Sequence, residues 1–267
     1  CHVRDKAYQK FKSLLGSLDS KKMIGIAGCS AQVEGQQLIQ KHPEINFIIG
    51  TDQIDSIPEV LFELKHGKKQ VLNLKQQDRI ESYSIETKIS RHDPMAFINI
   101  MKGCNHFCTY CIVPFTRGRE KSRPLNEIVA DVKRLVEFKG ISMVTLLGQN
   151  VNSFGKYEGE SFVELLSSLN DINGLELIRY TTSHPIDFTD DLIEAYTKLD
   201  KLERYLHLPV QSGSNNVLKK MKREYTVEHY KDVVRKFKNL NPDINLSTDI
   251  IVGFCSESDQ DFEDTMN

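Results

Sequence analysis

The sequence predicts an α/β protein in two parts, a small parallel sheet followed by a larger, partial (β/α) barrel. The first observation is that short apolar runs alternate with helix-like segments along the chain. The second is that residues 94–267 hold five successive strand–helix units, each strand ending in small or polar residues. Such alternation is typical of parallel sheets, and repeated units of this kind predict a (β/α) barrel.

Residues 1–74 are predicted to form the smaller part. Strands are expected over residues 23–27 and 45–49, between helices over residues 6–18, 34–41 and 57–66. Cys29 follows the first strand, where functional groups gather in open parallel sheets, although a lone cysteine is also a common core residue. Residues 75–93 are polar and lack a clear period, so we interpret them as a linker.

The second part is predicted to contain the five units of the barrel. Its strands are expected over residues 96–101, 144–147, 175–180, 205–208 and 244–252. Its helices are expected over residues 125–138, 162–169, 190–199 and 227–240, with Pro124 in the first turn of the first helix. The chain begins at Cys1 and stops inside an acidic, helix-like run, so we expect it to be a piece of a longer protein with a further unit.

The composition is that of an ordinary globular protein, with 39% hydrophobic and 27% charged residues among 267. No apolar run approaches the ~20 residues that span a bilayer. A net charge of -2 argues against a wholly basic nucleic-acid coat but leaves room for a local basic patch. Six cysteines, three of them clustered, favour reduced thiols and metal over disulfides, so we predict a cytoplasmic protein.

Cys104, Cys108 and Cys111 lie within eight residues, directly after the first strand of the second part. Thiols this close cannot all pair as disulfides, and they predict a metal centre. Three ligands are one short of a structural zinc or of a fully ligated iron–sulfur cube. A cube held by three cysteines keeps one iron open for a reactant, which indicates an enzyme. His106 would complete a zinc site only by folding back within its own short loop.

The cysteine spacing, with Tyr110 before the last cysteine, is accompanied by seven longer runs. These are residues 1–7 (CHVRDKA), 28–32 (GCSAQ), 107–123 (FCTYCIVPFTRGREKSR), 146–153 (LLGQNVNS), 181–188 (TTSHPIDF), 206–214 (LHLPVQSGS) and 247–253 (STDIIVG). With them the chain resembles the radical S-adenosylmethionine (radical SAM) enzymes, and more narrowly the methylthiotransferases. Within that family it is most similar to the tRNA-2-methylthio-N6-dimethylallyladenosine synthases.

The resemblance implies a [4Fe-4S] cluster on Cys104, Cys108 and Cys111, with SAM bound at the open iron. In this family, electron transfer cleaves SAM to a 5′-deoxyadenosyl radical, which abstracts hydrogen from C2 of the target adenosine. A methylthio group, with its methyl from a second SAM, is then inserted there. The implied product is 2-methylthio-N6-isopentenyladenosine at position 37 of tRNA.

The family also implies an N-terminal methylthiotransferase domain that holds an auxiliary [4Fe-4S] cluster. Cys1 and Cys29 match two of its three ligands, and the third is expected upstream of this chain, as the tRNA-gripping TRAM domain is expected downstream. Cys255 and Ser256 depart from the family, which usually has Pro-Gly in this turn. We expect a modest change in the turn, with Cys255 an extra thiol that is not a ligand.

The polar strand ends are expected to shape the SAM pocket. Glycine allows close approach because it has no Cβ, amides suit the amino and ribose groups, and a guanidinium suits the carboxylate. The expected residues are Tyr110, Gly148, Gln149, Asn150, Ser183, Gln211, Ser212, Arg223, Asp249 and Gly253. Turn or cap chemistry is the alternative for Asn150, Ser183 and Asp249. We interpret His184 and His207 as pocket-lining or core residues.

Arg117, Arg119, Lys121 and Arg123 form a basic run directly after the cysteines. Its predicted role is to contact phosphates of a tRNA anticodon stem-loop, and the alternative is a solvated charged loop. The family further implies a reducing electron-donor protein as a partner. We expect a monomer with no membrane contact.

Other functions remain open at this level. A sister methylthiotransferase would act on threonylcarbamoyladenosine in tRNA or on a ribosomal-protein aspartate, but the run through Arg117, Gly118 and Arg119 favours the isopentenyladenosine enzyme. An iron–sulfur electron-transfer protein would not need polar ends on every strand and would not bind SAM. A zinc-stabilised RNA-binding module would be colourless.

Overall fold

The computed structural model describes residues 6, 9–11, 13, 23–77 and 93–267. The chain divides into two compact units, Cys1–Asp78 with Phe115–Arg117, and Arg79–Pro114 with Gly118–Asn267. Cys1 and most of the predicted linker lie outside the described residues. The described residues of the predicted helix over residues 6–18 are helical.

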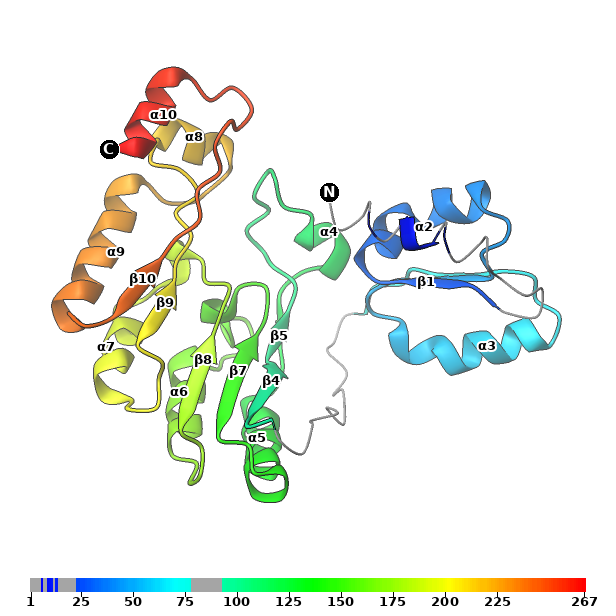
Figure 1. Cartoon of the computed structure of the whole chain (residues 1–267), viewed down its shortest axis with the longest axis horizontal. Helices are drawn as coiled ribbons and strands as arrows, with labels where there is room; N and C mark the ends of the chain where they lie inside the picture. The colour runs from blue at the N-terminus through cyan, green and yellow to red at the C-terminus, as the bar shows by residue number, and fades with distance from the viewer. Residues whose placement is uncertain (1–5, 7–8, 12, 14–22, 78–92) are drawn as a thin grey trace. The chain divides into compact units, whose positions relative to one another are not determined.

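The first unit contains a three-stranded parallel sheet in the order β1-β2-β3. Its elements are β1 (Gly25–Ala27), α2 (Cys29–Lys41), β2 (Phe47–Ile49), the 3-10 turn η1 (Ile54–Ser56), α3 (Ile57–Lys65) and β3 (Val71–Asn73). Helices α2 and α3 lie on opposite faces of the sheet (Figure 1). Ile48 packs in a cluster with Ala31 of α2, whereas the adjacent Ile49 packs with Val60 of α3. This alternation is the period-two geometry of a strand that is buried on both faces.

The predicted small parallel sheet is therefore confirmed, with two differences. Helix α2 begins at Cys29, five residues before the expected start, because its first turn carries Ser30 and Gln32 rather than an apolar pattern. Strand β3 was not predicted, since its three residues are too few to show a period. It completes the sheet by pairing with β2.

The second unit contains a parallel sheet in the order β4-β7-β8 and a parallel pair β9–β10. A bridge between Ile178 of β8 and Leu202 links the sheet to the segment that leads into β9. Short antiparallel strands β5 and β6 flank the cysteine segment. The strands are β4 (Met95–Asn99), β5 (Met101–Lys102), β6 (Lys121–Ser122), β7 (Met143–Leu147), β8 (Leu177–Tyr180), β9 (Tyr205–His207) and β10 (Asn245–Ser247).

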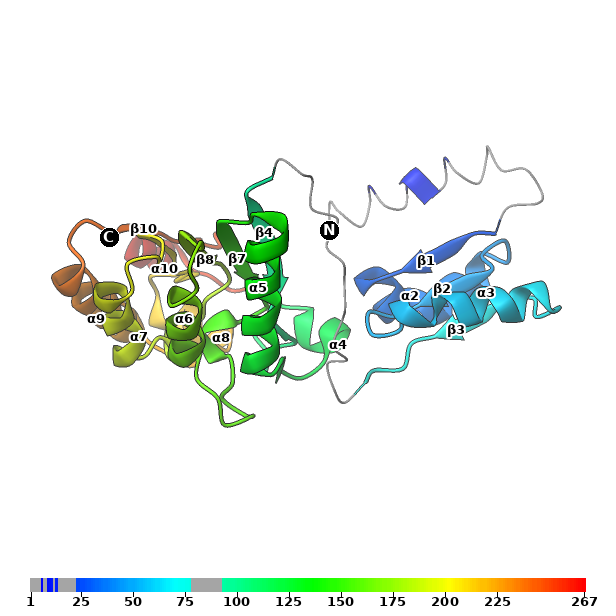
Figure 2. The ribbon, with the colours of Figure 1, turned by 90° about the horizontal axis from the view of Figure 1, so that it is seen from below.

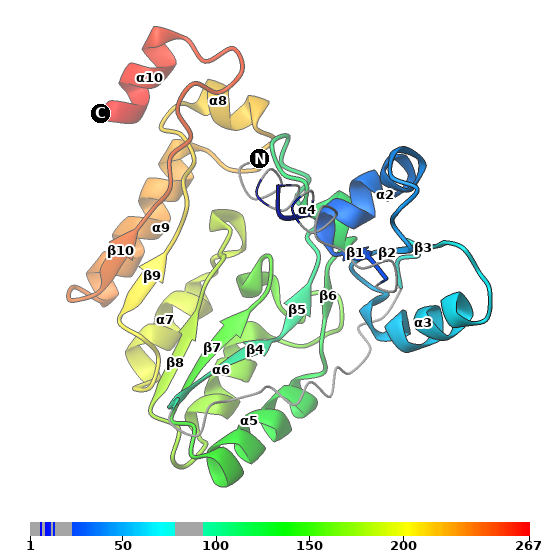
Figure 3. The ribbon, with the colours of Figure 1, turned by 45° about the vertical axis from the view of Figure 1, so that its right-hand side comes forward.

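The four predicted helices of the second unit follow the strands in the expected order. They are α5 (Leu125–Lys139), α6 (Phe162–Asn170), α7 (Asp190–Lys198) and α9 (Val227–Leu240). The unit also contains α8 (Asn215–Lys220), α10 (Asp259–Met266) and the 3-10 turns η2 (Val151–Ser153) and η3 (Pro185–Asp187), whereas Phe115–Arg117 of α4 (Val113–Arg117) group with the first unit. Helices α5, α6, α7 and α9 cover one face of the strands in chain order (Figures 2 and 3). Strand residues such as Leu146 and Ile178 are fully buried in the shared core with Val132 and Leu166. The partial (β/α) barrel is thus confirmed.

The boundaries differ most at the strands. Strand β10 ends at Ser247 rather than at Val252. Beyond it, Thr248 Oγ1 accepts from the Val210 N–H (2.8 Å) and Ile250 forms an isolated bridge with Gln211. Helix α8 was not predicted, although Ser214 caps it by accepting a hydrogen bond from the Val217 N–H. Pro124 is the N-cap of α5 rather than a first-turn residue. Among the described helices, none is both long and apolar enough to cross a membrane.

Candidate functional site

The three clustered cysteines lie on residues 103–111, here called the cluster loop, which follows β5. Two distant segments hold it through backbone groups. The Gly103 N–H donates to Oε1 of Gln149 (2.6 Å), just after β7, and the Thr109 N–H donates to the Met221 carbonyl (3.0 Å), just after α8. The loop is therefore positioned by the end of a barrel strand and by a turn more than a hundred residues away in the sequence.

Gly103 opens the cluster loop at a φ of +80°, a conformation that glycine adopts at little cost. A Cβ at this position would lie 2.1 Å from the Arg119 carbonyl oxygen. We therefore expect Gly103→Ala to lower the free energy of unfolding by about 2 kcal/mol or more, because the cost of the positive φ and the cost of the clash with the Arg119 backbone are added together. Gly140→Ala is the control, since Gly140 has a φ of +68° but open space around it. Chemical denaturation measures both, and equal losses would rule out the clash.

The cysteine sulfurs suit a cluster better than a single zinc ion. Cys108 is buried, and Cys104 and Cys111 are partly buried. A tetrahedral zinc with bonds of about 2.3 Å places its sulfur ligands about 3.8 Å apart. Within the described part of the chain, three ligand atoms lie within 4.8 Å of one another only at His106, His184 and Asp187, not at the three cysteines. Wider spacing is what a cube requires, since each thiolate then binds a different iron.

Burial raises the pKa of the Cys104 thiol to about 11. The thiol is therefore protonated at neutral pH, and iron has to displace its proton on binding. The donor set fits a [4Fe-4S] cluster with three protein ligands, which leaves one iron for another ligand.

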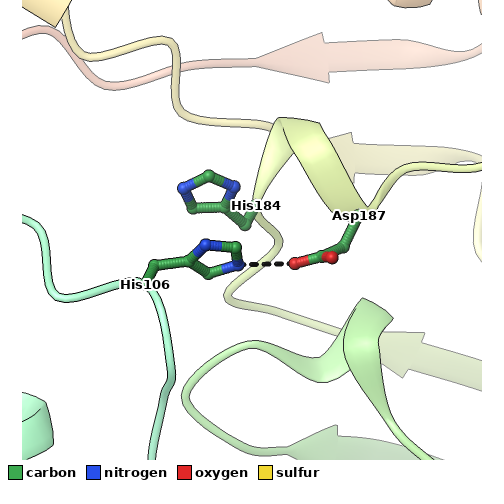
Figure 4. A group of neighbouring side chains, drawn as sticks. All are labelled: His106, His184 and Asp187. Atoms are coloured by element: carbon green, nitrogen blue, oxygen red, sulfur yellow. Dashed lines mark hydrogen bonds and ion pairs between the residues drawn. The ribbon is translucent and has the colours of Figure 1, made fainter. Parts of the chain in front are cut away.

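A histidine inside the cluster loop anchors the loop to the end of β8. The His106 Nε2 atom lies 2.6 Å from Oδ2 of Asp187 in turn η3, and its Nδ1 atom lies 3.0 Å from Oε2 of Glu224. Both carboxylates can only accept, so both ring nitrogens carry a proton and His106 is a cation. Burial lowers the pKa of His106, but the hydrogen bonds and charges of the two carboxylates outweigh it and the pKa is raised. Figure 4 shows the pair of His106 and Asp187.

Asp187 is the common acceptor of this cluster. Besides His106, it accepts from Nδ2 of Asn150 (2.8 Å) and from Nζ of Lys156 (3.1 Å). Burial opposes ionisation, but the hydrogen bonds from His106, Asn150 and Lys156 hold the pKa of Asp187 well below its usual range. The carboxylate thus stays charged while only 7% of its side chain is exposed.

The His184 ring stacks on the His106 ring, with centroids 3.8 Å apart and planes within 7° (Figure 4). Burial lowers the pKa of His184 to about 2, and the Arg223 and His106 charges add to this effect, so the ring is neutral. Ring nitrogens bind a metal in the plane of the ring. Two parallel rings at this spacing therefore cannot both ligate one ion, and the group of His106, His184 and Asp187 is an ion-pair cluster rather than a metal site.

Several predicted SAM-binding residues contact the cluster loop or leave a polar atom unused. Gln149 holds Gly103, and Tyr110 lies in the loop at 40% exposure. The Asn150 Oδ1 and Ser183 Oγ atoms are buried and have no hydrogen-bond partner among the described residues. Buried polar atoms of this kind normally find a partner, so these two fit a polar ligand such as SAM.

Other predicted SAM-binding residues have structural contacts instead. Ser212 is fully buried and bonds Thr265 and the Ser214 N–H, so it ties its loop to α10. The side chain of Met101 fills the space that a Cβ on Gly148 would occupy. These contacts explain why a small residue stands at each position without a ligand.

Three more predicted residues lie on the segments that follow β9 and β10. Gln211 has a φ of +72° and its N–H donates to the Asp249 carbonyl (2.9 Å). The Asp249 carboxylate is exposed, 3.3 Å from Nε2 of His207. Gly253 has a φ of +73° and its N–H donates to the Glu257 carboxylate.

The turn after Gly253 contains the departure noted in the sequence. Ser256 has a φ of +66°, which costs a serine more than it would cost a glycine. Its carbonyl accepts from Nζ of Lys220 (2.8 Å). The Cys255 thiol is exposed.

The basic run does not act as one surface. Arg123 is 8% exposed, with hydrogen bonds to Asp131 (2.6 Å) and to the Asn99 carbonyl (3.1 Å), so its predicted RNA contact is corrected to a structural role. Arg119 is exposed and lies over the Phe107 ring at 4.3 Å. Lys121 lies in β6, and Arg117 groups with the first unit.

Of the predicted auxiliary ligands, only Cys29 is described. It is the first residue of α2 and is exposed, directly after Gly28, which has a φ of +101°. Its expected place at a strand end is therefore confirmed, since β1 ends at Ala27.

Three residues of the site were missed by sequence reasoning. Asp187, Lys156 and Glu224 are single charged residues in turns, and nothing in their local pattern distinguishes them. The one available signal is the pair His184 and Asp187, which are three residues apart at the end of a predicted strand and therefore share one turn.

A three-cysteine loop after the first strand of a parallel half-barrel fits an iron–sulfur protein in which one iron keeps an open position. Residues 98–267 match the Radical SAM superfamily, and residues 1–50 match the uncharacterized protein family UPF0004. The chain belongs to the radical SAM superfamily.

Curated relatives are narrower in function. The whole chain is 48% identical over 278 residues to the tRNA-2-methylthio-N(6)-dimethylallyladenosine synthase of Clostridium botulinum (strain Langeland) and covers 61% of it. It is 41% identical over 277 residues to the synthase of that name from Histophilus somni and covers 58% of it. The expected resemblance is confirmed, and the chain spans about three-fifths of the length of these relatives.

Solved structures support the fold alone. The cobalamin-dependent S-adenosylmethionine radical enzyme OxsB matches 99% of this chain and 41% of its own with a TM-score of 0.63 at 13% identity. The radical S-adenosylmethionine methyltransferase TsrM from Kitasatospora setae matches 66% of this chain and 34% of its own with a TM-score of 0.52 at 18% identity.

Proposed function

We propose that this chain carries out radical SAM methylthiolation at C2 of N6-isopentenyladenosine at position 37 of tRNA. The observation that carries the proposal is the 48% identity of the whole chain to a synthase named for this reaction. The cluster loop supports it, because three thiols at the strand end fit a cluster with one open iron. When bound, the cluster and SAM together supply a radical that can abstract hydrogen from an unactivated carbon.

The chain's own residues would bind and orient these groups. Cys104, Cys108 and Cys111 would hold the cluster, and Tyr110 would lie beside the adenine of SAM. The unpartnered atoms of Asn150 and Ser183 would receive polar groups of SAM. The other expected SAM contacts are Gly148, Gln149, Gln211, Ser212, Arg223, Asp249 and Gly253. Of these, Ser212 and Arg223 have the weakest support, since the Ser212 hydroxyl is already bonded and four of the five Arg223 N–H donors are engaged.

Further parts of the proposal follow from the family. A second [4Fe-4S] cluster would use Cys29, Cys1 and a cysteine outside this chain. The partners would be a tRNA anticodon stem-loop and a reducing electron-donor protein, and the protein would act as a cytoplasmic monomer.

The direct test supplies the reconstituted protein with SAM, a chemical reductant and anticodon stem-loops that carry one modified adenosine. Nucleoside mass spectrometry should detect the 2-methylthio product on isopentenyladenosine and none on threonylcarbamoyladenosine. The reverse preference would favour a sister methylthiotransferase. Absence of 5′-deoxyadenosine with every RNA would contradict the radical reaction itself.

Arg119, which is exposed, and Lys121, which is half-buried, should contact RNA phosphates. We expect Arg119→Ala with Lys121→Ala to weaken stem-loop binding about tenfold or more and to lower the salt slope by about one for each lost contact. The control is Arg235→Ala, which removes an exposed arginine from α9. Fluorescence anisotropy at several salt concentrations measures both. If Arg235→Ala weakened stem-loop binding equally, the loss of net charge alone would explain the weaker binding.

A further inference from the structure

The last residue of α8 and the turn that follows it, residues 220–225, contact the cluster loop at successive positions. We call this segment the α8 turn. Thr109 donates twice to it, from its N–H to the Met221 carbonyl (3.0 Å) and from its hydroxyl to the Lys220 carbonyl (3.1 Å). The Lys222 ammonium lies 5.9 Å from the centre of the Phe107 ring. The α8 turn therefore follows the cluster loop along its length, and its central side chain, Arg223, points at a cysteine.

Arg223 has little capacity left for another ligand. Its Nε donates to the Tyr225 hydroxyl (3.0 Å) and its Nη2 to the Pro209 carbonyl (3.4 Å). Its Nη1 donates to Sγ of Cys108 (3.4 Å) and to the Tyr110 hydroxyl (3.3 Å). A guanidinium has five N–H donors, so four are engaged and the planar fork expected for a carboxylate is not free.

We propose that Arg223 is a positioning residue for the iron–sulfur cluster, which donates a hydrogen bond to the Cys108 sulfur and thereby raises the cluster's reduction potential. Hydrogen bonds to the sulfur ligands and nearby charge are among the factors that set such potentials. Reduction adds one electron from an external reductant, so the cluster becomes more negative by one charge. A cation and an N–H donor beside a ligand sulfur stabilise that reduced form more than the oxidised form.

The inference rests on the proposed cluster at Cys104, Cys108 and Cys111, and it does not depend on the RNA substrate. It also differs from the expected role of Arg223 as the carboxylate partner of SAM. That role would affect the cluster only when SAM is present, whereas a hydrogen bond to Cys108 acts without it.

The test is a redox titration of the reconstituted protein without SAM, with dithionite as reductant and EPR of the reduced cluster as the readout. Arg223→Gln removes the cation and should shift the midpoint potential to lower values. Arg223→Lys keeps the charge but loses the geometry of the donor, so its midpoint should lie between those of Arg223→Gln and the unchanged protein. Lys222→Gln is the matched control, because it removes one charge from the same turn without touching Cys108, and its midpoint should not move.

Three results would overturn the inference. A midpoint potential of Arg223→Gln equal to that of the unchanged protein would show that Arg223 does not tune the cluster. Equal shifts for Arg223→Gln and Lys222→Gln would show that only net charge matters. A shift that occurs only after SAM is added would return Arg223 to the carboxylate. If Arg223→Gln takes up no iron, Arg223→Lys against Lys222→Gln carries the test alone.

Results that contradict the proposed function can be distinguished from results that contradict only the role of Arg223. An unchanged protein that takes up no iron, or whose EPR spectrum does not respond to SAM, would contradict the radical SAM site itself. A SAM-responsive cluster whose midpoint ignores Arg223 would contradict only this inference.

Discussion

Cys108→Ala is expected to abolish iron binding at the cluster loop, where the unchanged protein should bind about four irons. Cys108 is the buried member of the three cysteines, and its sulfur accepts from Arg223. Removing it takes away one of only three protein ligands, and no other described thiol lies in the loop to replace it. Iron analysis and visible absorbance after anaerobic reconstitution measure the loss.

The control for this experiment is Cys255→Ala. Cys255 is equally free but exposed, with only the Ser256 hydroxyl near its sulfur at 3.9 Å. The Cys255→Ala protein should bind as much iron as the unchanged protein does. Both variants are best compared in a Cys29→Ala background, so that iron at the predicted auxiliary site does not obscure the count. Full iron content in Cys108→Ala would contradict the assignment of the ligands.

The three cysteines could be identified as candidate ligands because the pattern that marks them is local. Three thiols in eight residues can be recognised without any knowledge of the fold. His106 and Asp187 are 81 residues apart, and Cys108 and Arg223 are 115 residues apart. Such pairs are brought together by the barrel, so no local pattern reports them. The sequence therefore indicates candidate metal ligands, whereas the residues that position them are seen only in the folded structure.

The difference between local and long-range information also explains which predicted helix and strand boundaries match the structure. Helix α9 matches its predicted range, because its apolar residues keep a helical period from Val227 to Leu240. Strand β10 is shorter than predicted, because the apolar residues Ile250 and Ile251 continue the pattern where pairing is reduced to an isolated bridge between Ile250 and Gln211. Periodicity reports which residues are apolar, whereas a strand end depends on whether a neighbour is present to pair with it.

Residues of the same type that look equivalent in the sequence have different contacts in the folded structure. Ser183 and Ser212 both follow barrel strands, and the sequence assigns both to the SAM pocket. The Ser183 hydroxyl has no partner in the described part of the chain, whereas the Ser212 hydroxyl bonds Thr265 of α10. Arg119 and Arg123 separate in the same way, since one is exposed and the other is buried against Asp131.

Asp187→Ala is expected to lower the free energy of unfolding by about 3–5 kcal/mol, the usual cost of removing one partner of a buried ion pair. The change leaves the His106 cation, the Asn150 amide and the Lys156 ammonium without their shared acceptor. Asp190→Ala is the control, because Asp190 is an exposed aspartate paired with Lys236, and such pairs contribute about 0–1 kcal/mol. Chemical denaturation measures both variants. A loss under 1 kcal/mol for Asp187→Ala would show that the ion-pair cluster around Asp187 contributes little to stability.

The loss should also depend on pH in a way that identifies the pair. The pKa of Asp187 is lowered in the folded state, so its contribution is present above the unfolded pKa of about 3.9 and is lost as pH falls through the folded pKa. The pKa of His106 is raised, so its contribution is present below the unfolded pKa of about 6.5 and is lost as pH rises through the folded pKa. The difference between the unchanged protein and Asp187→Ala should therefore be largest between about pH 4 and 6.5. A difference that stayed constant to alkaline pH would mean that Asp187 acts through Asn150 and Lys156 and that the imidazolium of His106 contributes nothing.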